Sequence, residues 1–307
     1  MLHILQTALE LGFLYALIPM ALYLSFRVLN IADMTTDGCF VLGTAVSVTT
    51  AAAGHPLLAI PAAMAAGVCA GFVTALLQTR LGVPSILAGI VTNMGLYTIN
   101  LMVMNWSANV SLLKTATIFT LFQQTGIGGA WYEALLAGAM VLLAGMLLVL
   151  FLGTRLGLSI RATGDNIDMV RASSVNPTFT ITVGLCVANA LTALSGAMVG
   201  QYQNTADING GTGIVVIGLA CLIIGETVLG RKSVVKGALA AVMGSVIYRF
   251  IYAIVLYTKI MPVQGLKLVT AVIVALAIAF PTIKNWVAFQ QKKSARKKAH
   301  AAKGGRS

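Results

Sequence analysis

Ala134-Leu-Leu-Ala-Gly-Ala-Met-Val-Leu-Leu-Ala-Gly-Met-Leu-Leu-Val-Leu-Phe-Leu152 contains no charged or strongly polar residue. A helix needs about 20 apolar residues of this kind to cross the hydrocarbon core of a bilayer. Over all 307 residues, 58% are hydrophobic, 9% are charged and the mean hydropathy is +0.92. Soluble domains carry about 25% charged residues. The composition therefore excludes a soluble globular protein and predicts an all-α, polytopic membrane bundle.

Similar apolar runs, bounded by polar residues, glycine or proline, occur along the whole chain. Two of them, 38–53 and 214–229, are short for a full crossing. Residues 1–290 are expected to form one transmembrane domain and residues 291–307 a basic tail. About nine spans are expected, within a range of roughly eight to ten: 9–26, 38–53, 57–79, 84–104, 133–152, 179–200, 214–229, 236–257 and 266–283.

Lysine and arginine are distributed unequally between the two sets of predicted loops. If the C-terminal tail is cytoplasmic, nine spans place the N-terminus outside, with 16 basic residues in inward segments and 3 in outward ones. That asymmetry agrees with the positive-inside rule. The net charge of +12 reflects in part the basic run 292–298, directly after an apolar segment. Such a cluster indicates contact with anionic lipid headgroups rather than nucleic acid, because no folded nucleic-acid reader accompanies it.

The predicted inward loop 153–177 is the most informative of the polar segments. Gly164 is expected to break the chain, and either Asp165 or Asn166 to cap a new helix by accepting a free backbone N–H. A helix of two or three turns over residues 167–173 would follow.

Met169 and Val170 would project from this short helix as apolar knobs. Asp168 in its first turn and Arg171 in its last would match the helix dipole. Two interpretations remain open on this basis: the helix docks in a groove of a cytoplasmic protein, or it rests on lipid as an ordinary amphipathic helix.

The same loop reads Arg161-Ala-Thr-Gly-Asp-Asn166, then Met169-Val-Arg-Ala172 and Ser174-Val-Asn176. This pattern resembles R-A-x-G-x-N-x-x-A-A-x-x-x-G-I-N, the cytoplasmic signature of the membrane subunits of ATP-binding cassette importers for branched-chain amino acids and ribose. Met169-Val170 and Ser174-Val175 depart from it. Residues 29–43 resemble the family's entry into its second span, and residues 210–225 with 230–237 resemble its C-terminal half.

The resemblance implies a permease of the bacterial plasma membrane that imports a small polar solute, an amino acid. Residues 96–101 are similar to a branch linked to aromatic amino acids. The implied partners are a cytoplasmic ATPase, an extracytoplasmic substrate-binding lipoprotein and a second permease copy. The loop helix would be the coupling helix that docks on the ATPase, and the residues it implies for this contact are Arg161, Ala162, Gly164, Asp165, Asn166, Met169, Val170 and Arg171.

Polar groups inside a bilayer are costly and need a reason. Asp37, at the entry to the first short run, is interpreted as a helix cap in preference to a substrate contact, and Asp33 likewise. Asn93 and Asn100 are seven residues apart and therefore share one helix face. They bind either a passing solute or a neighbouring helix. The candidate pathway residues are Asp37, Gly38, Asn93, Tyr97, Asn100, Gly211 and Gly213.

Other polar residues inside the predicted spans are interpreted as packing contacts or have more than one possible role. Asn189, Thr192 and Ser195 form a stripe beside small residues, which is typical of close helix packing. The matched steps Gly38 to Gly43 and Gly213 to Gly218 suggest an internal repeat around a pathway. Arg249 is expected either to extend toward the membrane surface or to pair with a carboxylate.

Three functional classes follow. No G-x-x-x-x-G-K-[ST] phosphate loop is present, so an importer permease would depend on a separate ATPase. A secondary transporter driven by an ion gradient is the alternative, with Asp37 and Asp207 as candidate ion-coupling residues. The histidines His3, His55 and His300 have no metal-ligand spacing and no nucleophile–base set is visible, so no metal, cofactor or enzymatic activity is expected.

Overall fold

The computed structural model describes residues 2–112, 115–124, 126, 129–230, 233–257, 268, 270–276 and 279. The chain divides into two units, Met1–Thr258 and Lys259–Ser307, and the elements below belong to the first. In chain order they are α1 (Leu2–Leu22), the π-helix η1 (Tyr23–Val28), α2 (Thr36–Ala52), α3 (Pro56–Thr79), α4 (Ser85–Val103), β1 (Asn109–Ser111), α5 (Ile118–Gln124), η2 (Gly129–Trp131), α6 (Tyr132–Gly153), α7 (Arg155–Asp165), α8 (Ile167–Ala172), α9 (Pro177–Gln203), β2 (Thr205–Asp207), α10 (Ile214–Leu229) and α11 (Val234–Tyr257).

The predicted all-α membrane bundle is confirmed. Within the described residues, six helices are long and apolar enough to cross a membrane: His3–Val28, Pro56–Thr79, Ser85–Val103, Tyr132–Gly153, Pro177–Gln203 and Val234–Tyr257. The two runs predicted to be short form α2, of 17 residues, and α10, of 16 residues. Half of the expected span 266–283 lies outside the described residues, so the count of nine stays a prediction.

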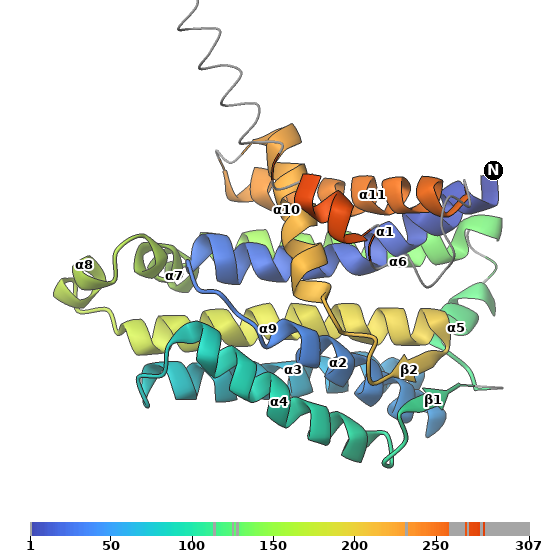
Figure 1. Cartoon of the computed structure of the whole chain (residues 1–307), viewed down its shortest axis with the longest axis horizontal. Helices are drawn as coiled ribbons and strands as arrows, with labels where there is room; N and C mark the ends of the chain where they lie inside the picture. The colour runs from blue at the N-terminus through green and yellow to red at the C-terminus, as the bar shows by residue number, and fades with distance from the viewer. Residues whose placement is uncertain are drawn as a thin grey trace, which may run out of the picture. The chain divides into compact units, whose positions relative to one another are not determined.

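Helix α9 lies at the centre of the bundle and packs mainly on α2 and α3, while α1 packs on α9, α6, α10 and α11 (Figure 1). The start of α9 is fixed locally, because the Asn176 side chain accepts a hydrogen bond from the Thr178 N–H at 3.0 Å and Pro177 occupies the first helical position. Apolar side chains of α1 and α9, among them Leu17, Leu185 and Met198, form the main hydrophobic core.

Close approach of α2 and α9 depends on glycine. A Cβ atom at Gly196 would overlap the carbonyl oxygen of Phe40, whereas one at Gly95 on α4 would meet nothing within 4 Å. We expect Gly196→Ala to lower the free energy of unfolding by about 1–3 kcal/mol, because backbones must separate to admit the methyl group. Gly95→Ala is the matched control and should leave stability equal or slightly higher. Thermal unfolding of the purified variants in detergent measures the difference, and equal midpoints would contradict this packing.

Small elements lie at the two ends of the helices. Figure 1 places α7 and α8 at one end and β1, β2 and α5 toward the other. Strand β1 pairs antiparallel with β2, with Val110 opposite Ala206. The buried Gln201 side chain accepts from the Ile118 N–H at 2.8 Å and donates to Ser47 Oγ at 3.0 Å. These contacts hold the segment that leads from α9 through β2 into α10.

The α8 end corrects two expectations for loop 153–177. Gly164 does not break the chain but lies inside α7, where a Cβ atom would overlap the Val28 carbonyl oxygen. Glycine is therefore needed there for close contact between α7 and η1 rather than for a turn. Asn166, not Asp165, caps α8, accepting from the N–H groups of Asp168 at 3.0 Å and Met169 at 3.1 Å.

The second correction concerns the apolar knobs. Val170 is only 2% exposed, because it turns back toward the neighbouring helices α7 and α9. Met169 is 58% exposed as expected, and Ile167 is also exposed. The outer apolar face of α8 is therefore Ile167 and Met169.

Candidate functional site

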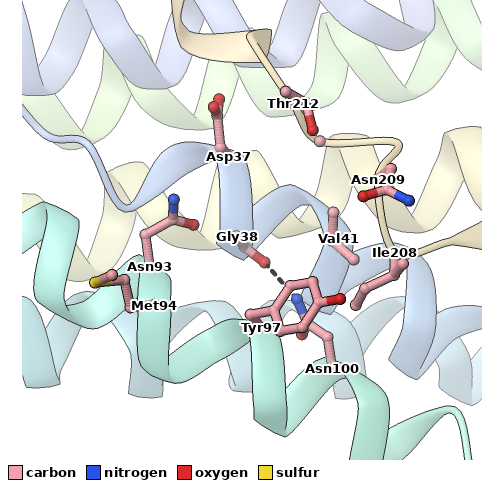
Figure 2. Close-up of a pocket in the computed structure, with 11 residues that line it drawn as sticks. Asp37, Gly38, Val41, Asn93, Met94, Tyr97, Asn100, Ile208, Asn209 and Thr212 are labelled. Atoms are coloured by element: carbon pink, nitrogen blue, oxygen red, sulfur yellow. Dashed lines mark hydrogen bonds between the residues drawn. The ribbon is translucent and has the colours of Figure 1, made fainter. Parts of the chain in front are cut away.

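A pocket of about 480 Å³ opens between α2, α4 and the segment that precedes α10. Figure 2 shows Asn93 and Tyr97 projecting from α4, Gly38 and Val41 on α2, and Asn209 and Thr212 on the segment between β2 and α10. This cavity is called the Asp37 pocket below. Its lining residues are Asp37, Gly38, Val41, Asn93, Met94, Tyr97, Asn100, Ile208, Asn209, Gly211 and Thr212.

The structure brings six of the seven predicted pathway residues into this one pocket. Asn93, Tyr97 and Asn100 lie on the same face of α4, as their spacing predicts. Gly38 leaves room for the Asn93 side chain, because a Cβ atom at position 38 would overlap the Asn93 side-chain oxygen and displace it. Gly213 is the exception: it does not line the pocket, although its N–H donates to the Asp37 carboxylate.

Asn100 gives the pocket wall an unused acceptor. Its side chain is 1% exposed and donates from Nδ2 to the Gly38 carbonyl oxygen at 3.1 Å. The Oδ1 atom is buried and has no hydrogen-bond partner among the described residues. A buried acceptor without a donor is unfavourable by about 1–3 kcal/mol, so a buried water molecule bound there would stabilise this wall.

Asp37 is the single charged residue in the pocket lining, and it caps a helix other than its own. Its Oδ2 accepts from the Gly213 N–H at 3.1 Å and its Oδ1 from the Val215 N–H at 2.9 Å. The capping interpretation is therefore correct in kind but concerns the N-terminus of α10, not that of α2. The carboxylate is stabilised by the dipole of α10, and Gly213 adopts a left-handed conformation (φ +84°) at this junction.

The pocket also contains residues that the sequence did not single out. Asn209 and Thr212 have side chains with no hydrogen bond to other described residues, and they face Tyr97 across the pocket. Their signal in the sequence is only a run of polar residues between Asp207 and Gly213. The pairing of β1 with β2 places that run against α4, and no local pattern predicts a pairing across so many residues.

Asp33 and the polar stripe of α9, which consists of Asn189, Thr192 and Ser195, make hydrogen bonds that stabilise the fold. Asp33 is 4% exposed, accepts from the Thr35 N–H at 2.9 Å and from Asn189 Nδ2 at 2.7 Å. Ser195 donates to the Leu14 carbonyl oxygen at 2.8 Å, and Thr192 to the Ala188 carbonyl oxygen of its own helix. The packing interpretation of this stripe is confirmed.

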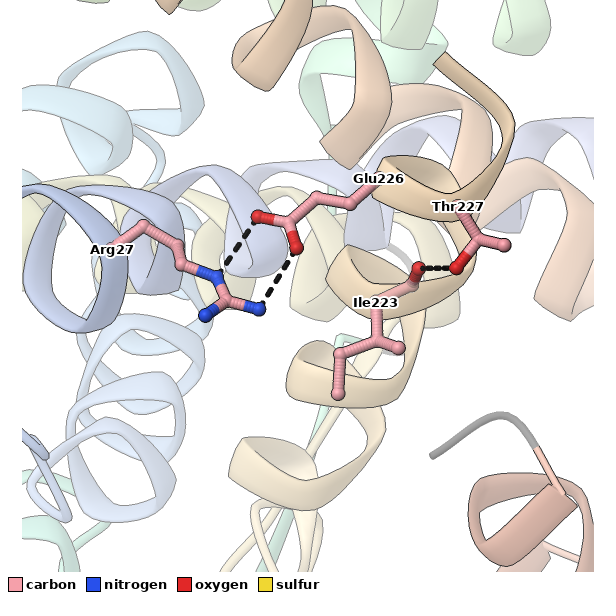
Figure 3. Close-up of polar contacts among 4 residues, drawn as sticks. All are labelled: Arg27, Ile223, Glu226 and Thr227. Carbon is pink, nitrogen blue, oxygen red and sulfur yellow. Dashed lines mark hydrogen bonds and ion pairs between the residues drawn. The ribbon is translucent and has the colours of Figure 1, made fainter. Parts of the chain in front are cut away.

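The opposite end of α10 carries an ion pair that the sequence did not predict. Arg27 in η1 donates from Nε to Glu226 Oε1 at 2.9 Å and from Nη2 to Oε2 at 2.8 Å (Figure 3). The Glu226 side chain is 4% exposed and that of Arg27 is 29% exposed. Both ends of α10 are thus held by one short stretch of chain, from Arg27 to Asp37.

The predicted ATPase-contact residues lie on the surface helix α8, on its cap and on the end of α7 that precedes it. Arg161, Asp165, Asn166, Met169 and Arg171 are exposed, Ala162 and Gly164 are half-buried, and Val170 is buried. Thr163 on α7 shares a hydrogen bond of 2.8 Å with Thr180 on α9, and Gly164 packs on Val28 of η1. These contacts connect α8, through α7, to η1 and α9.

The chemistry of the Asp37 pocket suits a small polar molecule. The described residues include no group of three or more histidine, cysteine, aspartate or glutamate side chains that could hold a metal ion. The pocket instead offers amide, hydroxyl and carboxylate oxygens to a solute.

Comparison with known proteins finds one family and two similar proteins. Residues 4–282 match the family described as the permease component of the branched-chain amino acid transport system. A protein of Clostridioides difficile (strain R20291) described as a tyrosine transport system permease protein is 31% identical over 265 residues, which cover 86% of each chain. An uncharacterized protein of Rickettsia prowazekii (strain Madrid E) is 29% identical over 283 residues, covering 90% of this chain and 97% of its own. No solved structure matches.

Proposed function

Because this chain belongs to the family of permease components of branched-chain amino acid transport systems and is a multi-pass protein of the bacterial inner membrane, we propose that it forms the translocation pathway of an ATP-driven importer. The ATPase is a separate cytoplasmic subunit, an extracytoplasmic binding protein delivers the solute, and two copies of the permease form the membrane unit. The α8 end faces the cytoplasm, and nine spans place the N-terminus outside.

The observation that best supports this proposal is the exposed face of α8 together with the contacts that hold this helix in place. Ile167 and Met169 are exposed apolar residues on a capped helix, and Arg171 extends beside them. Such a face fits a groove on a folded partner, and it supports docking on the ATPase in preference to resting on lipid. From α8 the chain of contacts runs through α7 and Gly164 to Val28, and from there to Asp37 within nine residues.

The pocket chemistry supports an amino acid as the solute. Its lining has one carboxylate, and its other polar groups are the uncharged side chains of Asn93, Tyr97, Asn100, Asn209 and Thr212. The Asp37 carboxylate is the proposed acceptor for an ammonium group. With Tyr97 at the wall and a tyrosine permease among the relatives, an aromatic zwitterion such as L-tyrosine is the proposed solute.

Uptake by proteoliposomes that contain permease, ATPase and binding protein tests the proposal. We expect L-tyrosine accumulation to require ATP on the side of the membrane that holds the ATPase and to survive an ionophore. Accumulation that needs no ATPase but collapses with the ionophore would instead identify a secondary transporter. Asp37 and Asp207 do not favour that alternative, because both carboxylates accept backbone N–H groups.

A further inference from the structure

Arg249 is a cation in the middle of a membrane-spanning helix. Its guanidinium carbon lies 3.7 Å from the centroid of the Tyr15 ring. Its Nε is buried and has no hydrogen-bond partner among the described residues. A charge at such a depth is strongly unfavourable unless an opposite charge or a polar group compensates it, and in transport proteins it typically marks a pathway.

The position of the Arg249 guanidinium along the membrane-spanning helices follows from the packing of α1 on α11. Ser245 Oγ donates to the Gly12 carbonyl oxygen at 2.7 Å, and Gly237 lies against the Tyr23 ring. The two helices therefore run antiparallel. Tyr15 is near the midpoint of the span His3–Val28. The guanidinium group thus points toward the middle of both helices, not toward their ends.

No side-chain carboxylate of the chain is available to Arg249. The protein has eight acidic residues, all within the described part, and residues 258–307 contain none. Asp165 and Asp168 are exposed at the α8 end. The other six have partners elsewhere: Glu10 with Tyr202, Asp33 with Asn189, Asp37 with α10, Glu133 with Tyr132, Asp207 with the Asn209 N–H and Glu226 with Arg27. Within the described residues, no acidic side chain is therefore recorded as a partner of Arg249, and we look for its counter-ion outside the chain.

A groove of about 320 Å³ leads to Arg249 between the first half of α1 and the last half of α11. Its walls are mainly apolar and include Leu11, Tyr252 and Tyr257. A smaller void next to Arg249 is bordered by Ile214 and Gly218 of α10. The first turn of α10, which Asp37 caps, therefore borders the void beside Arg249, and the segment just before that turn, with Gly211 and Thr212, lines the Asp37 pocket.

We propose that Arg249 binds the carboxylate of the translocated solute within this groove, at a point of the pathway separate from the Asp37 pocket. The proposal rests on the proposed function and makes Arg249 a specificity-determining residue in the permease itself. Arginine presents its N–H edge to a carboxylate in a two-bond arrangement, and Tyr15 covers the face of the guanidinium, which leaves that edge for the ligand. A phospholipid phosphate does not fit as well, because the guanidinium points toward the middle of the two helices, and Tyr257 is already eight residues, or about 12 Å, farther along α11.

Two substitutions test the proposal in the complete complex. Arg249→Met removes the charge and keeps an apolar side chain that a membrane helix tolerates, and Arg249→Lys keeps the charge. With L-tyrosine, we expect Arg249→Met to lower ATP-dependent uptake at least tenfold while ATP hydrolysis without binding protein stays within twofold of wild type. Arg249→Lys should recover part of the uptake. Arg80→Gln, an exposed arginine at the end of α3, is the control and should transport normally.

Binding measurements identify the anion. Equilibrium dialysis of the purified permease in phosphatidylcholine nanodiscs should show that wild type prefers L-tyrosine to tyramine, which lacks the carboxylate, and that Arg249→Met abolishes this preference. Normal uptake by Arg249→Met, or an unchanged preference, would overturn the proposal. So would native mass spectrometry showing that the variant loses bound phosphatidylglycerol but keeps L-tyrosine uptake. Absence of ATP-dependent uptake in wild type would instead contradict the proposed function.

Discussion

Replacing Asp37 by alanine is expected to lower ATP-dependent solute uptake by at least tenfold. The substitution removes the acceptor for the N–H groups of Gly213 and Val215. It also removes the one carboxylate of the Asp37 pocket. Loss of a helix cap typically lowers stability by about 1 kcal/mol, so most of the protein should still fold. Initial rates of uptake in proteoliposomes, normalised to the amount of inserted permease, measure the effect.

Two further variants separate capping from charge. Asp37→Asn keeps one side-chain oxygen as an acceptor and should retain part of the helix cap while it loses the negative charge. Glu133→Gln removes a carboxylate on α6, outside the pocket, and should leave uptake unchanged. Wild-type uptake by Asp37→Ala would show that neither the α10 cap nor the pocket carboxylate takes part in transport.

Breaking the ion pair between Arg27 and Glu226 is expected to destabilise the protein by about 3 kcal/mol. Removing one partner weakens the electrostatic compensation of the other charge, and the Glu226 side chain is 4% exposed. Arg27→Gln and Glu226→Gln should each lower the thermal midpoint and reduce uptake. Exchange of the charges, Arg27→Glu with Glu226→Arg, should recover part of both. Wild type, Arg27→Gln, Glu226→Gln and the variant that carries both glutamines form a double-mutant cycle. Thermal unfolding in detergent and uptake are measured for each of the four.

A second ion pair in the chain is the matched control. Arg171 and Asp168 lie 3.7 Å apart on α8 with side chains 65% and 85% exposed. Because solvent screens exposed pairs, Asp168→Asn should change the thermal midpoint very little. Additive effects of Arg27→Gln and Glu226→Gln would contradict the inference that this pair anchors the C-terminal end of α10.

Much of the fold follows from local sequence. The long apolar runs that became α3, α6 and α9 have the length and composition of membrane helices, and packing cannot change that requirement. The wall of the Asp37 pocket was also predictable in part, because seven-residue spacing places Asn93 and Asn100 on one face whatever the helix packs against.

The remaining features depend on contacts between distant parts of the chain. Asp37 lies 176 residues from Gly213, and Arg27 lies 199 residues from Glu226. A helical pattern specifies which face of an element is polar but not which other element meets that face. The same limit explains Gly164, whose partner is a carbonyl in η1, and Val170, whose burial depends on the helices beneath α8.

The most direct test is a permease that lacks residues 167–171, reconstituted with the proposed ATPase and the proposed binding protein. If α8 is the contact with the ATPase, the binding protein should no longer stimulate ATP hydrolysis and uptake should fall to background, while the permease still inserts and still binds solute. Stimulated ATP hydrolysis and uptake equal to those of wild type would contradict the coupling role of α8 and, with it, the proposed ATP-driven mechanism.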